Sequence, residues 1–73
     1  MKWNLHPATE DSYRTEERTL LLKELERTQN VIETAQENFN EAKDPALVDS
    51  YIYEIKAAQM RYQFLLKRVK QIT

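Results

Sequence analysis

The stretch from Asp44 to Ile72, DPALVDSYIYEIKAAQMRYQFLLKRVKQI, decides how the rest of the chain is interpreted. Pro45 has a fixed φ and no backbone N–H, which suits the first position of a helix, and the Asp44 carboxylate can cap that helix. Proline also keeps the residue before it out of the α region, so a preceding helix must end there. The pair predicts a helix from about residue 45 to residue 72.

Two apolar stripes run along this predicted helix. The first, which we call the seam, alternates spacings of three and four residues and comprises Val48, Tyr51, Ile55, Ala58, Tyr62, Leu65, Val69 and Ile72. The second, the outer stripe, has the same spacing on roughly the opposite side and comprises Tyr53, Ala57, Met60 and Phe64. A helix that is apolar on two faces needs a cover for each of them.

A matching seam precedes the proline. It keeps the same alternation and comprises Leu21, Leu25, Thr28, Ile32, Ala35, Phe39 and Ala42. This pattern predicts a first helix over about 12–43, with its start between Thr9 and Thr15, where several residues can cap a helix. A turn is expected at about 43–45, and residues 1–11 are expected to form a flexible arm.

The two seams fit each other in one antiparallel register. Ala42 then meets Val48 beside the turn, and the layers continue in step until Leu21 meets Val69. Small residues face large ones in several layers, which is how cores reach native packing density. The prediction is an all-α fold, a two-helix antiparallel hairpin of coiled-coil type over residues 12–73, about 40 Å long. The same register brings the acids Glu10, Glu16 and Glu17 near the cations Lys67, Arg68 and Lys70.

Composition places the chain among small helical proteins. Its 73 residues allow one domain, and 41% hydrophobic and 32% charged residues with no glycine favour long helices over sheets. No cysteine is present, so no disulfide is expected and a reducing cytoplasm is compatible. No apolar run approaches the roughly 20 residues of a membrane span, and the first residues do not lead into a signal-peptide core. We expect a cytoplasmic protein without a membrane segment.

The hairpin cannot cover all of its own apolar surface. Beyond the outer stripe, further apolar residues flank the two seams: Leu20, Leu22, Val31, Ile52 and Leu66. A chain of this size rarely gains more than about 3–5 kcal/mol from its own core, so self-association is a common support. We expect a homo-oligomer, with a dimer forming a four-helix bundle favoured; a different protein partner is the other occupant considered.

Charge is distributed unevenly along the chain. Residues 1–54 hold 6 Lys or Arg and 12 Asp or Glu, whereas residues 55–73 hold five cations and no acid. These cations are Lys56, Arg61, Lys67, Arg68 and Lys70. One interpretation is that they complement the helix dipole and face acids of the first helix. The alternative is a nucleic-acid-associated accessory protein that uses this basic end, although the chain as a whole, with a pI of about 5.8, lacks a strongly basic footprint.

The second helix also carries a family resemblance. Its most specific parts are Asp44-Pro45, the run YIYEIKAA at 51–58, Arg61-Tyr62 and Leu65-Leu66. These resemble the YaaL-type family, small uncharacterised proteins of Gram-positive bacteria classed as a domain of unknown function, over about residues 20–72. The resemblance implies a bacterial cytoplasmic protein. It implies no activity or cofactor, and the frequent position of family genes near a recombination-repair gene is the basis for considering a nucleic-acid context.

No residue pattern indicates catalysis. A phosphate-binding loop needs glycine, no Glu-x-x-His pair is present, and His6 is the only histidine, so we expect it to be solvated rather than a metal ligand. Trp3 is expected to dock on the bundle or to contact a partner. The expected function is therefore a non-catalytic helical protein-interaction module, with no catalytic, cofactor-binding or metal-binding residues.

Overall fold

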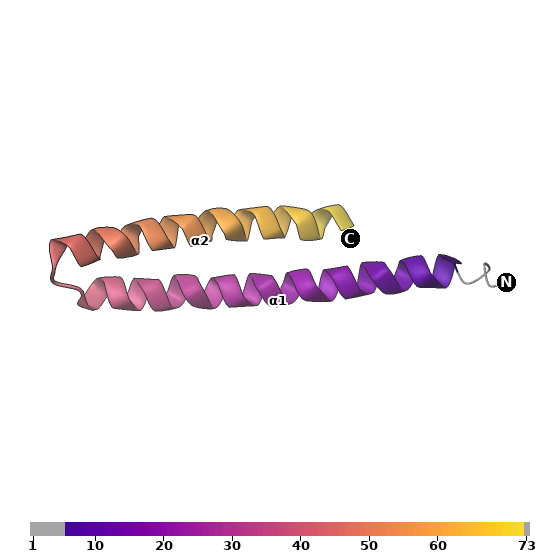
Figure 1. The fold of residues 1–73 in the computed structure, drawn as a ribbon, viewed down its shortest axis with the longest axis horizontal. Helices are drawn as coiled ribbons and strands as arrows, with labels where there is room; N and C mark the ends of the chain where they lie inside the picture. The colour runs from indigo at the N-terminus through magenta and orange to yellow at the C-terminus, as the bar shows by residue number, and fades with distance from the viewer. Residues whose placement is uncertain (1–5, 73) are drawn as a thin grey trace.

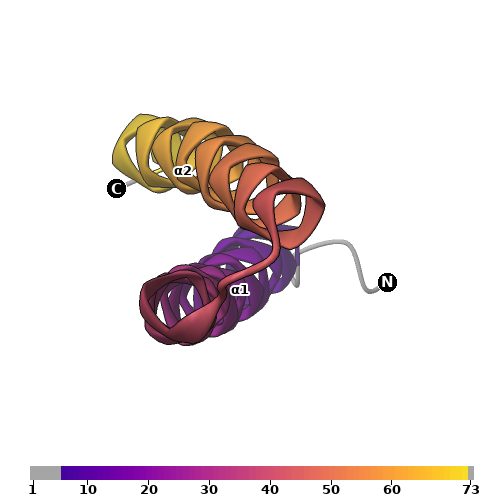
Figure 2. The same cartoon turned by 90° about the vertical axis from the view of Figure 1, so that its left-hand side faces the viewer.

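The computed structural model describes residues 6–72, and the side chains of residues 13–72. It contains two helices, α1 (His6–Glu41) and α2 (Pro45–Ile72), which run antiparallel and side by side (Figure 1). The view from the turn shows one helix lying against the other as a single layer (Figure 2). The predicted helical hairpin is confirmed. Trp3 lies outside the described residues.

Helix α1 begins earlier than its caps indicated. It starts at His6 and not between Thr9 and Thr15, so residues 6–11 are helical where a flexible arm was expected. The physical reason is the position of Pro7, because a proline in the first turn costs no hydrogen bond: its missing N–H would have had no partner there. With 36 residues against the 28 of α2, α1 extends past the end of α2 at the open end of the hairpin (Figure 1).

The turn has the chemistry that Asp44-Pro45 predicted. The Asp44 carboxylate Oδ1 accepts hydrogen bonds from the backbone N–H of Ala46 at 2.8 Å and of Leu47 at 3.4 Å. Its backbone carbonyl accepts the first intrahelical bond, from Val48 at 2.9 Å. At the other side of the turn, the N–H of Ala42 bonds the Phe39 carbonyl at 3.3 Å, which closes the end of α1 with a tighter 3₁₀-type bond. Three residues, 42–44, therefore suffice to reverse the chain.

The two seams meet and form the core. Every seam residue of both helices is buried or half-buried, and Ala35 has no exposed surface. Leu25, Leu65 and Val69 form a buried cluster, against which Leu21 and Tyr62 pack. These five residues belong to the layers that the antiparallel register brings together near the open end of the hairpin. Thr28 is the one buried polar residue of the described core, and no buried side-chain polar atom among the described residues lacks a hydrogen-bond partner.

Candidate interaction faces

The outer stripe of α2 is the most exposed large apolar surface of the described chain. Tyr53 is 72% exposed, and Met60 and Phe64 are each 66% exposed, while Ala57 between them is also open to solvent. Their neighbours in the seam are covered: Leu65, next to Phe64, is 8% exposed. The helix geometry explains the contrast, because each residue of the outer stripe follows a seam residue by two positions and therefore points to the far side of the helix.

Two flanks separate the seam from the outer surfaces of the hairpin, and they differ in charge. The charged flank consists of residues that recur every seven positions on one side of the seam: Glu17, Glu24, Val31 and Asn38 on α1 and Leu47, Glu54, Arg61 and Arg68 on α2. The neutral flank consists of residues that recur every seven positions on the other side of the seam: Leu22, Gln29 and Gln36 on α1 and Ile52, Gln59 and Leu66 on α2. Five of the eight residues of the first flank carry a charge, and the second carries none.

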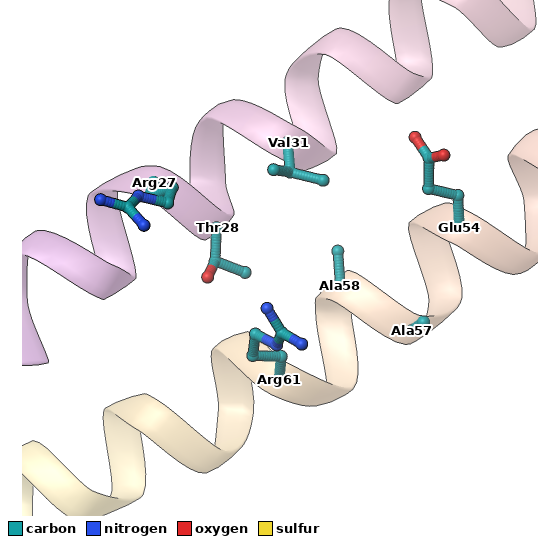
Figure 3. Close-up of a pocket in the computed structure, with 7 residues that line it drawn as sticks. All are labelled: Arg27, Thr28, Val31, Glu54, Ala57, Ala58 and Arg61. Atoms are coloured by element: carbon teal, nitrogen blue, oxygen red, sulfur yellow. The ribbon is translucent and has the colours of Figure 1, made fainter.

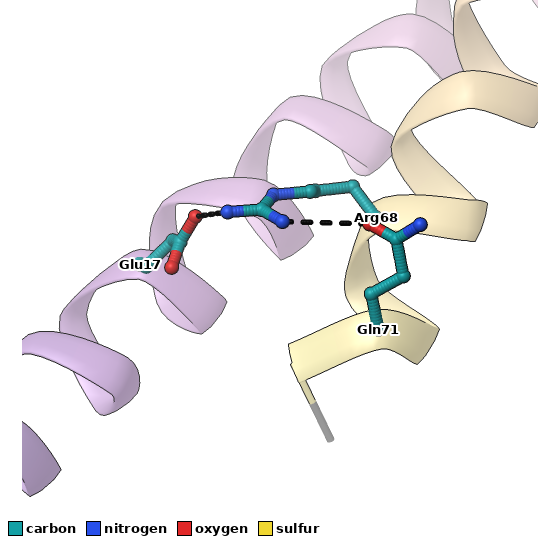
Figure 4. Close-up of polar contacts among 3 residues, drawn as sticks. All are labelled: Glu17, Arg68 and Gln71. Carbon is teal, nitrogen blue, oxygen red and sulfur yellow. Dashed lines mark hydrogen bonds and ion pairs between the residues drawn. The ribbon is translucent and has the colours of Figure 1, made fainter.

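An ion pair joins the two helices across the charged flank, at the end of the hairpin away from the turn. The Arg68 guanidinium Nη2 donates to the Glu17 carboxylate at 2.7 Å, and its Nη1 donates to Gln71 at 3.4 Å (Figure 4). The expected contact between an acid of the first helix and this arginine is therefore present. Glu17 and Arg68 keep 42% and 43% of their side-chain surface exposed, so solvent screens the pair and its net contribution is small.

A groove of about 230 Å³ opens in the middle of the charged flank (Figure 3). Its walls come from both helices, with Arg27, Thr28 and Val31 on one side and Glu54, Ala57, Ala58 and Arg61 on the other. Glu54 and Arg61, which are seven residues apart, lie on the same flank of α2. The groove itself was missed at the level of sequence. The sequence feature that could have indicated it is that Thr28, Ala57 and Ala58 lie in neighbouring layers. Their small side chains leave space that larger residues would fill.

The five cations of α2 do not converge on one surface. Arg68 is held by Glu17, and Arg61 reaches into the groove beside Thr28 (Figure 3). Lys56, Lys67 and Lys70 are exposed, and Lys67 lies on the outer surface whereas Lys56 and Lys70 border the neutral flank. The basic end thus presents separate charges around the helix.

The described residues offer no set of ligands for a metal. No group of three or more His, Cys, Asp or Glu side chains comes together within the part of the chain that the structure describes. No helix among these residues is long and apolar enough to cross a membrane.

Fold and faces together define a class, a small two-helix hairpin with one covered seam and further apolar surface left open. The chain belongs to the family described as "Protein of unknown function (DUF2508)", whose model matches residues 8–72. This match agrees with the resemblance to a domain of unknown function. No curated protein and no solved structure matches the chain.

Proposed function

We propose that the hairpin is a non-catalytic helical protein-interaction module that self-associates through the outer stripe of α2. The exposure of the outer stripe carries this proposal. Tyr53, Met60 and Phe64 line up along α2, each about two thirds exposed or more. Aromatic residues and methionine are the side chains most enriched where a protein surface is covered by a partner.

The order of residues in the outer stripe supports a second copy as the occupant. The spacings between successive members are four, three and four residues, so the stripe has the same spacing in both directions. An antiparallel second copy can therefore place Tyr53 against Phe64 of the other chain, and Ala57 against Met60. Each small side chain then faces a larger one, which favours close approach of the helices.

The area available is compatible with a specific interface. An aromatic side chain offers about 150–250 Å², so Tyr53 and Phe64 expose about 200–350 Å² per chain. Two copies contribute twice this area, and Met60 and the surrounding side chains add to it. The total approaches the roughly 1,000 Å² that separates specific interfaces from incidental contacts.

The test is the mass in solution, by light scattering coupled to gel filtration. A Met60→Glu/Phe64→Glu variant places two charges in the outer stripe, and burying them against a second copy would be strongly unfavourable. We expect the mass of this variant to be at most half that of the wild type, with unchanged helical circular dichroism. Glu24→Gln/Glu41→Gln, which changes two exposed or half-exposed acids of α1, serves as control and should keep the wild-type mass. A wild-type mass equal to one chain, or a variant mass equal to the wild type, would refute the proposal.

A further inference from the structure

The neutral flank is a second surface that the hairpin leaves uncovered. Its three aliphatic residues, Leu22, Ile52 and Leu66, are among the exposed large hydrophobic residues, and the three residues between them in the layers are all glutamine. Helices of a bundle core carry apolar residues at the seam and on one adjoining flank, whereas an isolated pair keeps charges on both flanks. This hairpin has charges on one flank only.

All six residues of the neutral flank lie on one side of the hairpin. The ion pair joins Arg68, which directly precedes the seam residue Val69, to Glu17, which lies seven residues before Glu24, the residue preceding Leu25 in the seam. The groove likewise brings together Val31, Glu54 and Arg61, which also precede seam positions. Since the preceding residues of α1 and α2 share one side, the following residues share the other.

The neutral flank is arranged in matched levels. Leu22 follows Leu21 and Leu66 follows Leu65, and these two seam residues pack in the same part of the core. Leu22 and Leu66 therefore lie at one level. Two turns further toward the hairpin turn, Gln29 lies level with Gln59, and two turns beyond these, Gln36 lies level with Ile52.

We propose that the neutral flank binds a second copy of the chain, so that two hairpins form a four-helix bundle with both turns at the same end. This face is separate from the outer stripe and does not rest on the function proposed above. In this arrangement Leu22 and Leu66 of both copies form one leucine layer, and Gln29 and Gln59 of both copies form a layer in which each side-chain amide can both donate and accept. The charged flank is unsuited to the same role, because Glu24, Arg61 and their neighbours would lose their hydration.

Charge complementarity selects the orientation of the second copy. The acids Glu26 and Glu33 border the neutral flank on α1, and Lys56 and Gln63 border it at matching levels on α2, with Asp49 and Lys70 beyond them. With both turns at the same end, α1 lies over α2 of the second copy, and Glu33 faces Lys56 of that copy. With the turns at opposite ends, α1 lies over α1, and Glu26 faces Glu33 of the other copy twice. The first arrangement gains two attractive pairs, whereas in the second the two repulsive pairs are offset by Asp49 facing Lys70 of the other copy, so charge favours the first.

Two different self-association faces predict an assembly of four chains or more, since each face joins chains in pairs. Light scattering on three variants tests this. Leu22→Glu/Leu66→Glu should reduce the mass to that of two chains, Met60→Glu/Phe64→Glu should do the same, and the variant with all four changes should have the mass of one chain. If Leu22→Glu/Leu66→Glu keeps the wild-type mass while Met60→Glu/Phe64→Glu lowers it, the neutral flank is not an interface and the outer stripe still is. The converse result retains the neutral flank and rejects the outer stripe.

A charge reversal tests the same face without touching its apolar residues. Within one hairpin Glu33 accepts a hydrogen bond from Gln29 at 3.2 Å, and both Glu33 and Lys56 are exposed, so changing them leaves the fold intact. Lys56→Glu, made in the Met60→Glu/Phe64→Glu background, should raise the dissociation constant of the remaining dimer about tenfold, because two attractive pairs become repulsive. Adding Glu33→Lys should restore the original constant. No change on Lys56→Glu, or no recovery on Glu33→Lys, would overturn the proposed orientation.

Discussion

The seam and the outer stripe of α2 have the same spacing of apolar residues, yet only the seam is covered. Leu65 in the seam is 8% exposed and Phe64, the residue before it, is 66% exposed. The difference lies in what faces them, because α1 supplies a matching set of residues to the seam and nothing within the described chain to the outer stripe. Spacing thus identifies a surface suited to burial, while the rest of the chain determines whether that burial occurs within one molecule.

The largest expected effect comes from truncating the seam. Leu65→Ala removes buried contacts in the cluster near the open end and should cost about 2–5 kcal/mol, close to the whole stability expected of a hairpin this small. Thermal unfolding monitored by circular dichroism measures this loss of stability. Phe64→Ala removes a larger side chain at the adjacent position and serves as the matched control, since its cost should fall on association and leave the helicity of the dilute chain unchanged. Equal loss of helicity in the two variants at low concentration would show that the two faces do not differ as described.

Enlarging a small residue should distinguish the covered seam from the exposed outer stripe in the same way. Ala35→Leu adds three carbon atoms where no surface is exposed, and overpacking of this kind costs about 1–3 kcal/mol. Ala57→Leu makes the same change on the outer stripe, where the hairpin has free space. Urea unfolding of both variants at low concentration should show a lower midpoint for the first only. A lower midpoint for Ala57→Leu as well would mean that the outer stripe is covered within one chain.

The fold was readable from the sequence because its signals were local and redundant. Asp44-Pro45 marked the helix start, and two independent seams agreed on one antiparallel register. The start of α1 could not be predicted in the same way, because a proline such as Pro7 can either end one segment or begin a helix. The surrounding sequence does not distinguish these two possibilities. The groove beside Thr28 also required coordinates, since it depends on how small side chains of two helices combine across the charged flank.

A moderate effect is expected at the turn. Asp44→Ala removes the acceptor for the N–H groups of Ala46 and Leu47, and loss of such a cap costs about 0.5–2 kcal/mol. The effect should be on the stability of the hairpin and not on association. Asp49→Ala, an exposed acid one turn into α2, is the matched control and should change the unfolding midpoint little. Similar losses in both variants would indicate a general charge effect and not the cap.

The smallest effect is expected at the Glu17–Arg68 pair. An ion pair with this exposure contributes a few tenths of a kcal/mol, and a double-mutant cycle with Glu17→Gln and Arg68→Gln should give a coupling energy below about 1 kcal/mol. A much larger coupling would show that the open end of the hairpin is held by this pair and not by the seam.

The nucleic-acid alternative predicts a different behaviour of the same basic end. Phosphate contacts by Lys56, Lys67 and Lys70 would give an affinity for duplex DNA that falls steeply as salt increases. Because the five cations of α2 are separated around the helix and Arg68 is paired, we expect no such binding in a fluorescence anisotropy titration at low salt. Measurable, salt-sensitive binding that is lost in a Lys67→Ala/Lys70→Ala variant would favour the alternative.

The contrast between the two faces of α2 is tested most directly by the thermal unfolding midpoint as a function of protein concentration. For a chain stabilised by its own copies the midpoint rises with concentration. The wild type should show such a rise, Leu65→Ala should lower the midpoint at every concentration, and Met60→Glu/Phe64→Glu should make the rise smaller without lowering the midpoint at the most dilute point. A wild-type midpoint that does not change with concentration, or a rise that Met60→Glu/Phe64→Glu leaves unaltered, would contradict the account.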